Sequence, residues 1–189
     1  MTALTPPPPP PPAPAVEDDR PPRTTPWLWF AAFFVIMGLV AARVPTVVRE
    51  AAARMPEDVK RELSPNALDM ATTVAGIAFI GTYAVVMALY LWLVAFLDKR
   101  ILRTKASLGP LKVGLYFAIV VASTVPVHLL AVLAQVAEVR SFSGYYVYFP
   151  LVVAALLAAY RKHWLGLPGR RKALVILVAA AVPLLAILG

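Results

Sequence analysis

The chain has 189 residues, of which 60% are hydrophobic and 15% charged, and its formal net charge at pH 7 is +8. Soluble domains average roughly 45–50% apolar and about 25% charged residues, so this composition excludes an ordinary water-soluble globule. The chain has no cysteine and only two histidines. Disulfides, thiolate metal centres, iron–sulfur clusters and imidazole-rich metal sites are therefore excluded.

Residues 1–26 form a proline-rich segment that contains the unbroken run Pro6 to Pro12. Proline has a fixed φ angle and no N–H donor, so this run favours polyproline II and is incompatible with a helix or a sheet. We therefore expect residues 1–26 to be a disordered cytoplasmic tail. The tail serves either as a spacer or as a ligand for a proline-recognising domain.

Five apolar segments follow the tail and predict an all-α, polytopic integral membrane protein. A helix rises 1.5 Å per residue, so about 20 residues are needed to cross a hydrocarbon core of about 30 Å. Within a membrane domain of residues 27–189, the predicted transmembrane helices are 27–44, 65–98, 113–137, 145–160 and 173–188. The last two are shorter than a full crossing requires, and 173–188 is the weaker of them.

Residues 45–64, between the first two predicted spans, form the polar connection that is long enough to fold by itself. Its apolar side chains recur at helical spacing, at Val48, Ala52, Met55, Val59 and Leu63. Pro56 interrupts this pattern. We expect an amphipathic hairpin or interfacial helix, which lies on the outer membrane surface or contacts a partner.

Lysine and arginine are distributed unevenly between the connections. If the N-terminus is cytoplasmic, twelve cations fall on the cytoplasmic side, and the six outer cations face six carboxylates. The positive-inside rule then predicts that the C-terminus lies outside. The basic loops 98–105 and 161–172 would meet anionic lipid headgroups, which explains the charge without nucleic acid. We expect a multi-pass protein of a cell membrane, and the Ala-, Pro- and Arg-rich composition favours the bacterial inner membrane.

The third predicted span carries the clearest candidate for an intramembrane polar site. Pro126 removes one helical hydrogen bond and frees a carbonyl one turn earlier, which Ser123 or Thr124 could satisfy. Thr124, His128 and Gln135 share one face of this helix. A histidine inside a membrane span is a functional hypothesis by default, because burying a titratable group in hydrocarbon is costly.

The second predicted span presents small and hydroxyl-bearing side chains on one face, among them Thr73 and Tyr83. We expect this face to meet the third span, with Tyr83 reaching His128. Two interpretations follow for His128. It stays neutral and joins helices by hydrogen bonds, or it has a functional role, as a proton-accepting site in a carrier or as a ligand to a cofactor.

No catalytic motif is present, because the sequence lacks a glycine-rich phosphate loop, a His-Glu-x-x-His pair and a Gly-x-Ser-x-Gly elbow. We therefore expect no enzyme activity, no cofactor and no metal. The first hypothesis is a non-catalytic accessory or assembly subunit that binds other membrane proteins, or itself, through helix–helix contacts. The alternative is a small carrier or channel lined by the candidate residues Thr73, Tyr83, Thr124, His128 and Gln135, with a kink at Pro126.

Overall fold

The computed structural model describes residues 23–62, 64–102, 112–141 and 144–188. Residues 1–22, which hold most of the predicted disordered tail, lie outside the described residues, as does part of the basic loop 98–105. The described chain forms helices and short connections without any strand. The all-α class is therefore confirmed.

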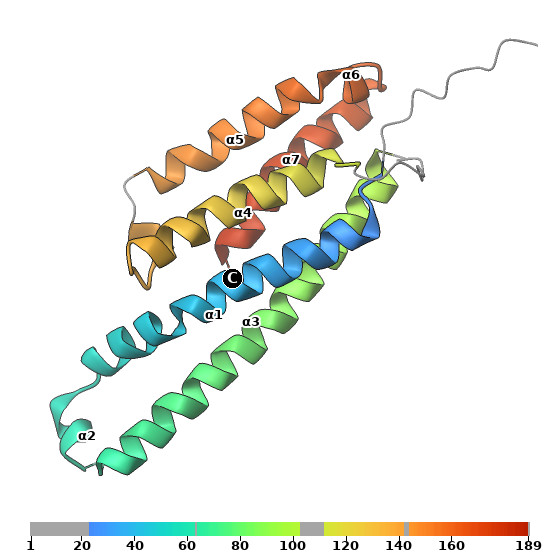
Figure 1. Ribbon diagram of the computed structural model, residues 1–189. Coiled ribbons are helices and arrows are strands. Elements are labelled where there is room, and N and C mark those ends of the chain that lie inside the picture. The colour runs from blue at the N-terminus through green and yellow to red at the C-terminus, as the bar shows by residue number, and fades with distance from the viewer. Residues whose placement is uncertain (1–22, 63, 103–111, 142–143, 189) are drawn as a thin grey trace, which may run out of the picture.

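Five helices account for most of the described chain (Figure 1). They are α1 (Pro26–Ala53), α3 (Pro65–Ile101), α4 (Leu115–Leu133), α5 (Tyr145–Ala159) and α7 (Gly169–Leu188). The short elements are α2 (Glu57–Glu62), α6 (Arg161–Trp164) and a 3₁₀ turn, η1 (Val139–Ser141). Among the described helices, α1, α3 and α4 are long and apolar enough to cross a membrane, and α5 is a shorter apolar helix.

Helix α1 continues past the point where the sequence predicted its end. Pro45 typically disfavours a helix interior by about 3 kcal/mol, yet the helix runs through it to Ala53. The C-terminal half of α1 packs closely on α3, since a Cβ atom at Gly76 would lie 3.2 Å from Val44 Cγ1. Residues 45–53, predicted as part of a connection, are therefore helical because tertiary packing outweighs the local break.

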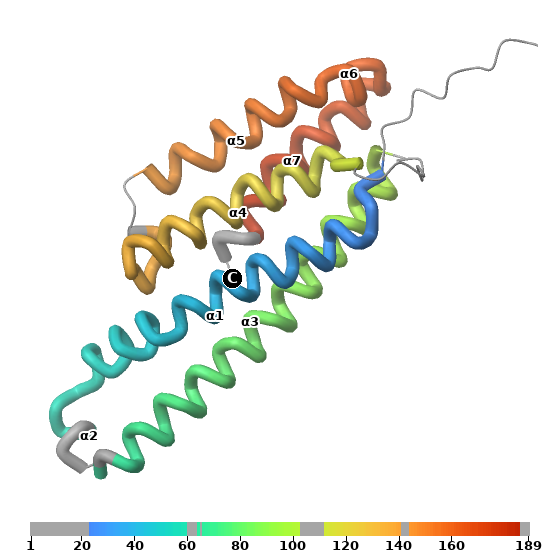
Figure 2. Tube along the Cα trace, in the orientation of Figure 1, coloured from blue at the N-terminus to red at the C-terminus, as the bar shows by residue number. Residues whose placement is uncertain are grey.

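The helices form a bundle from which one hairpin projects. Helix α4 contacts α1, α3, α5 and α7, and Figures 1 and 2 show α1 and α3 extending together beyond the ends of α4 and α5. The 19 residues of α4 span about 28 Å, whereas the 37 residues of α3 span about 55 Å. The bundle thus matches one hydrocarbon core, and the α1–α3 hairpin is longer than that core.

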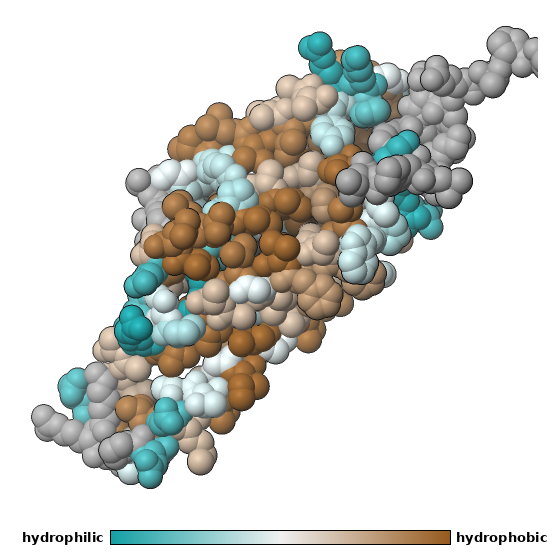
Figure 3. All heavy atoms as spheres, viewed as in Figure 1, coloured by the Kyte–Doolittle hydropathy of each residue, from teal (hydrophilic) through white to brown (hydrophobic). Residues whose placement is uncertain are grey.

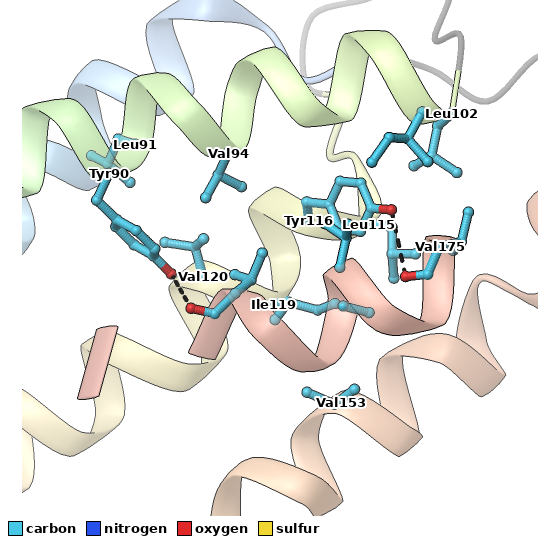
Figure 4. Close-up of a cluster of buried hydrophobic side chains, with 14 of the residues drawn as sticks. Tyr90, Leu91, Val94, Leu102, Leu115, Tyr116, Ile119, Val120, Val153 and Val175 are labelled. Carbon is cyan, nitrogen blue, oxygen red and sulfur yellow. Dashed lines mark hydrogen bonds between the residues drawn. The ribbon is translucent and has the colours of Figure 1, made fainter. Parts of the chain in front are cut away.

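The hydrophobic core lies where α3, α4 and α7 meet (Figure 4). Tyr116 is fully buried there, and its hydroxyl donates a hydrogen bond to the Val175 carbonyl at 3.5 Å. The Tyr90 hydroxyl donates to the Val182 carbonyl at 3.0 Å. Both bonds end on α7, so the segment with the weakest sequence signal is attached to the bundle through buried tyrosines.

Large apolar side chains cover much of the outer surface of the bundle. Figure 3 shows brown side chains over the middle of the visible face and teal ones toward its ends. Phe34 and Leu177 remain 68% and 65% exposed. This distribution is typical of helices that face lipid, since monomeric soluble proteins rarely expose large contiguous apolar patches.

Candidate functional site

The candidate site is a polar cluster between α1, α3 and α4, centred on His128 of α4. Arg43 of α1 places its Nη1 atom 2.9 Å from His128 Nδ1. On the other side of the ring, the Tyr83 hydroxyl of α3 lies 3.1 Å from His128 Nε2. The predicted contact between Tyr83 and His128 is therefore present, and Arg43 is an additional partner.

These two contacts determine the tautomer of His128. An arginine side chain has donors and no acceptor, so His128 Nδ1 must accept the hydrogen bond from Arg43. The neutral ring then carries its proton on Nε2, and this N–H donates to the Tyr83 hydroxyl oxygen. Protonation of Nδ1 would place two donors against each other. His128 is therefore held neutral for as long as Arg43 stays in place.

Arg43 is the residue of this site that sequence reasoning missed. Its position next to the end of the predicted span 27–44 favours an exposed cation, but its side chain is only 9% exposed. A second nitrogen, Nη2, donates to the Ala137 carbonyl, which follows α4. Burying a charge is costly unless hydrogen bonds compensate for it. The sequence feature that indicates a special role for Arg43 is that it is the single charged residue between Trp27 and Val48.

A cavity of about 400 Å³ adjoins this cluster. Its wall includes Ser123 and Thr124 of α4, Tyr145 of α5, and Glu138 and Arg140 of the connection between them. The volume lies within the range of small-molecule sites, roughly 300–1,000 Å³. Thr124 therefore belongs to the same site as His128 and Tyr83.

The hydrogen bonding around Pro126 differs from the prediction. Ser123 and Thr124 donate to carbonyl oxygens of the preceding turn of α4, and neither hydroxyl reaches the carbonyl of Ala122, which Pro126 leaves without a helical donor. The Tyr148 hydroxyl of α5 donates to that carbonyl at 2.6 Å. A neighbouring helix thus satisfies the break. Pro126 itself is exposed and lies outside the cavity wall.

Gln135 does not join the site, because α4 ends at Leu133 and the predicted helical face ends with it. Gln135 has a φ angle of 53°, in the left-handed region. The Val136 N–H donates to the Ala131 carbonyl and the Gln135 N–H to the Val132 carbonyl, which is a Schellman termination of the helix. The Gln135 side chain is consequently exposed rather than aligned with His128.

Thr73 also lies away from the site. It precedes Tyr83 by ten positions on α3, which corresponds to about 15 Å along the helix axis. Its side chain is exposed, and the hydroxyl donates to the Asp69 carbonyl at 2.9 Å. The structure thus brings together Tyr83, Thr124 and His128, and leaves Thr73, Pro126 and Gln135 outside.

An exposed ion-pair network lies beside the cluster. Arg54, just after α1, contacts Glu138 at 3.1 Å and Glu50 at 2.5 Å. The hydrogen bond that Arg54 donates to Glu138, together with the negative charges of both carboxylates, raises the pKa of Arg54 above its usual value. Exposed ion pairs add little to stability, so this network contributes little to the attachment of α1 to the connection after α4.

The chemistry open to this site is hydrogen bonding and the binding of a polar or anionic group. Within the described ranges, no three histidine or carboxylate side chains are grouped so that they could hold a metal ion. Neutral His128 cannot act as a proton acceptor without first separating from Arg43. The geometry therefore favours the interpretation in which His128 joins helices.

Comparison with known proteins adds no family to this description. No protein-family model matches the chain, and neither the curated proteins nor the solved structures contain a significant match.

Proposed function

We propose that this chain is a five-span membrane protein with a cytoplasmic N-terminus and an outer C-terminus, acting as a non-catalytic accessory or assembly subunit. The support for the orientation is chemical. The end of the bundle where α1 begins and α3 ends carries the exposed cations Lys99, Arg100, Arg161 and Lys162, and such cations prefer the cytoplasmic side. We call this the basic end.

The support for five crossings comes from the packing of α5 and α7. Both helices contact α4 and each other, and α4 is long enough to span the hydrocarbon core. The 15 residues of α5 reach about 22 Å. Helices of this length can cross where the bilayer thins locally.

The observation that carries the assembly role is the projecting hairpin. Asp98 near the end of α3 lies beside Gly114 at the start of α4, so the excess length of α3 extends from the opposite end of the bundle. About 20 residues of α3 suffice to cross the core. Residues 65–77, together with 46–53 of α1 and α2, therefore form an outer arm beyond the hydrocarbon region.

The outer arm presents an apolar stripe to its surroundings. Met70, Val74 and Ile77 share one face of α3, turned away from Gly76, and are 70%, 60% and 68% exposed. The stripe continues into the membrane region at Val85, which is 61% exposed. Lipid covers the part of the stripe within the membrane, but the part on the outer arm needs a protein surface to exclude water. A transmembrane helix of another subunit, extended beyond the bilayer, would cover both parts.

Native electrophoresis of tagged protein, extracted from its own membranes in a mild detergent, tests this role. The wild-type chain should migrate as a complex larger than a monomer, and the double variant Val74→Asn with Ile77→Asn should migrate as a monomer. Val147→Asn is the matched control, because Val147 is 61% exposed but lies on α5. A monomeric wild type, or a control that dissociates equally, would contradict the proposal.

The alternative function, a small carrier or channel, is favoured by the 400 Å³ cavity lined by Arg43, Tyr83 and His128. The positive charge of Arg43 makes anions the preferred solutes for such a path. Purified protein in sealed vesicles should then support an anion or proton flux that His128→Ala abolishes. If wild-type vesicles show no flux, or the variant is unchanged, the carrier function is excluded.

A further inference from the structure

A second cavity, of about 450 Å³, lies between α1 and α3 at the basic end, far from His128. Most of its wall is apolar and aromatic, including Trp29, Phe33 and Trp92. Its polar residues are Arg23, Thr24 and Asp98, which come from the chain before α1 and from the last turns of α3. The cavity thus combines a long apolar wall with a small charged pocket.

Asp98 is the unusual residue of this cavity. Its side chain is only 2% exposed, and one carboxylate oxygen, Oδ1, has no hydrogen-bond partner among the described residues. It also lies near the C-terminus of α3, where the helix dipole favours cations over anions. A buried carboxylate in this position is costly unless donors or a positive charge reach it. Arg23 supplies one nearby positive charge.

Gly114 shows that the pocket around Asp98 depends on a close approach of three segments. The Gly114 N–H donates to Thr24 Oγ1 at 2.8 Å. A Cβ atom at Gly114 would lie 2.7 Å from Thr24 Oγ1 and 3.0 Å from Asp98 Oδ2. Only glycine leaves room for both groups here. The start of α4, the end of α3 and the chain before α1 therefore form a defined polar pocket.

We propose that this cavity binds a phospholipid whose head group carries a primary ammonium, namely phosphatidylethanolamine. The ammonium has N–H donors that would satisfy the unpartnered oxygen of Asp98, and the phosphate would pair with Arg23. The part of an acyl chain next to the head group would lie against Trp29, Phe33 and Trp92. Phosphatidylcholine has no N–H donor, and phosphatidylglycerol has no cation for Asp98, so the site discriminates between head groups.

A head-group series on the wild-type protein tests this without any substitution. The full chain is equilibrated in micelles with equimolar phosphatidylethanolamine and its mono-, di- and trimethylated forms with identical acyl chains, and bound lipid is counted by native mass spectrometry. Retention should fall stepwise as N–H donors are lost. The ratio between the first and last members should be about tenfold or more. Equal retention of all four lipids would overturn the proposal.

Two variants of the same helix connect the preference to the cavity. Asp98→Asn keeps the shape of the side chain but removes its charge, and it should reduce the ethanolamine-to-choline retention ratio to near one. Asp69→Asn, at the exposed opposite end of α3, should leave the ratio at the wild-type value. An unchanged preference in Asp98→Asn would contradict the site, and if that variant does not fold, the wild-type series decides.

Discussion

The two ring nitrogens of His128 have different partners, and this asymmetry gives the residue a structural role. Nδ1 accepts from Arg43, and Nε2 lies at the Tyr83 hydroxyl, so one neutral imidazole connects α1, α3 and α4. Hydrogen bonds between transmembrane helices contribute about 0.6 kcal/mol on average and up to about 1.7 kcal/mol. A bond from a charged donor, as at Arg43, belongs at the upper end of this range.

At the residue scale, we predict the tautomer of His128 at neutral pH. ¹⁵N NMR of histidine-labelled protein should show one ring with an unprotonated Nδ1 and a protonated Nε2. Arg43→Met removes the donor to Nδ1, so this signal should change toward a mixture of tautomers. Arg49→Met is the control, because Arg49 lies on the same helix and is exposed. A doubly protonated His128 in the wild type would refute the assignment.

At the scale of elements, the hydrogen bond from Tyr148 to Ala122 links α5 to the proline break of α4. Tyr148→Phe should lower the free energy of unfolding by about 1 kcal/mol, because the Ala122 carbonyl loses its donor. Pro126→Ala restores a backbone N–H at position 126, which can donate to the Ala122 carbonyl within the helix. In the Pro126→Ala background, Tyr148→Phe should therefore lower the free energy of unfolding by clearly less than it does in the wild type.

A double-mutant cycle, measured by thermal or denaturant unfolding in detergent, tests this coupling. Tyr146→Phe is the matched control, because Tyr146 is 66% exposed on the same helix. It should have a similarly small effect in both backgrounds. If the Tyr148 and Pro126 effects are simply additive, the Ala122 carbonyl is satisfied in another way.

At the scale of the whole molecule, the proposed topology predicts which positions a membrane-impermeant reagent can reach. The native chain has no cysteine, so each introduced cysteine is the single reactive thiol. In intact cells, Glu57→Cys in the outer arm and a cysteine appended after Gly189 should react with a charged maleimide. Lys162→Cys, at the basic end, should react only after the membrane is permeabilised.

The two outer positions report on separate parts of the proposal. Protection of Glu57→Cys in intact cells would invert the orientation derived from the positive charges. Protection of the C-terminal cysteine, with Glu57→Cys still labelled, would mean that α7 does not cross the membrane. Five spans would then be replaced by four crossings and a buried final helix.

The all-α class could be predicted from local properties. The lengths of the apolar runs and the positions of the prolines each depend on one segment of the chain alone. Ser64 before Pro65 is an example. A hydroxyl residue at the N-cap followed by proline at the first helical position is typical of a helix start, and the Ser64 hydroxyl does accept from the Ala67 N–H at 3.3 Å. A capping bond spans three residues, so the local sequence contains all the information that it needs.

The composition of the candidate site depended on contacts between distant parts of the chain. Arg43 reaches His128 across 85 positions and Ala137 across 94, and no local pattern specifies such pairs. Gln135 left the predicted polar face because the chain turned into a left-handed conformation two residues after Leu133. The prediction that Gln135 shares a face with His128 requires the helix to continue to residue 135, but α4 ends at Leu133.

The sequence by itself determined that the chain is helical and strongly apolar, with a marked asymmetry of positive charge, since these properties add up residue by residue. The tertiary structure alone decided which polar groups are buried and which partner each one has. The physical reason is that burial and hydrogen bonding depend on how helices pack. Gly76 lets Val44 of α1 approach α3 closely, and Gly114 allows Asp98 and Thr24 to converge.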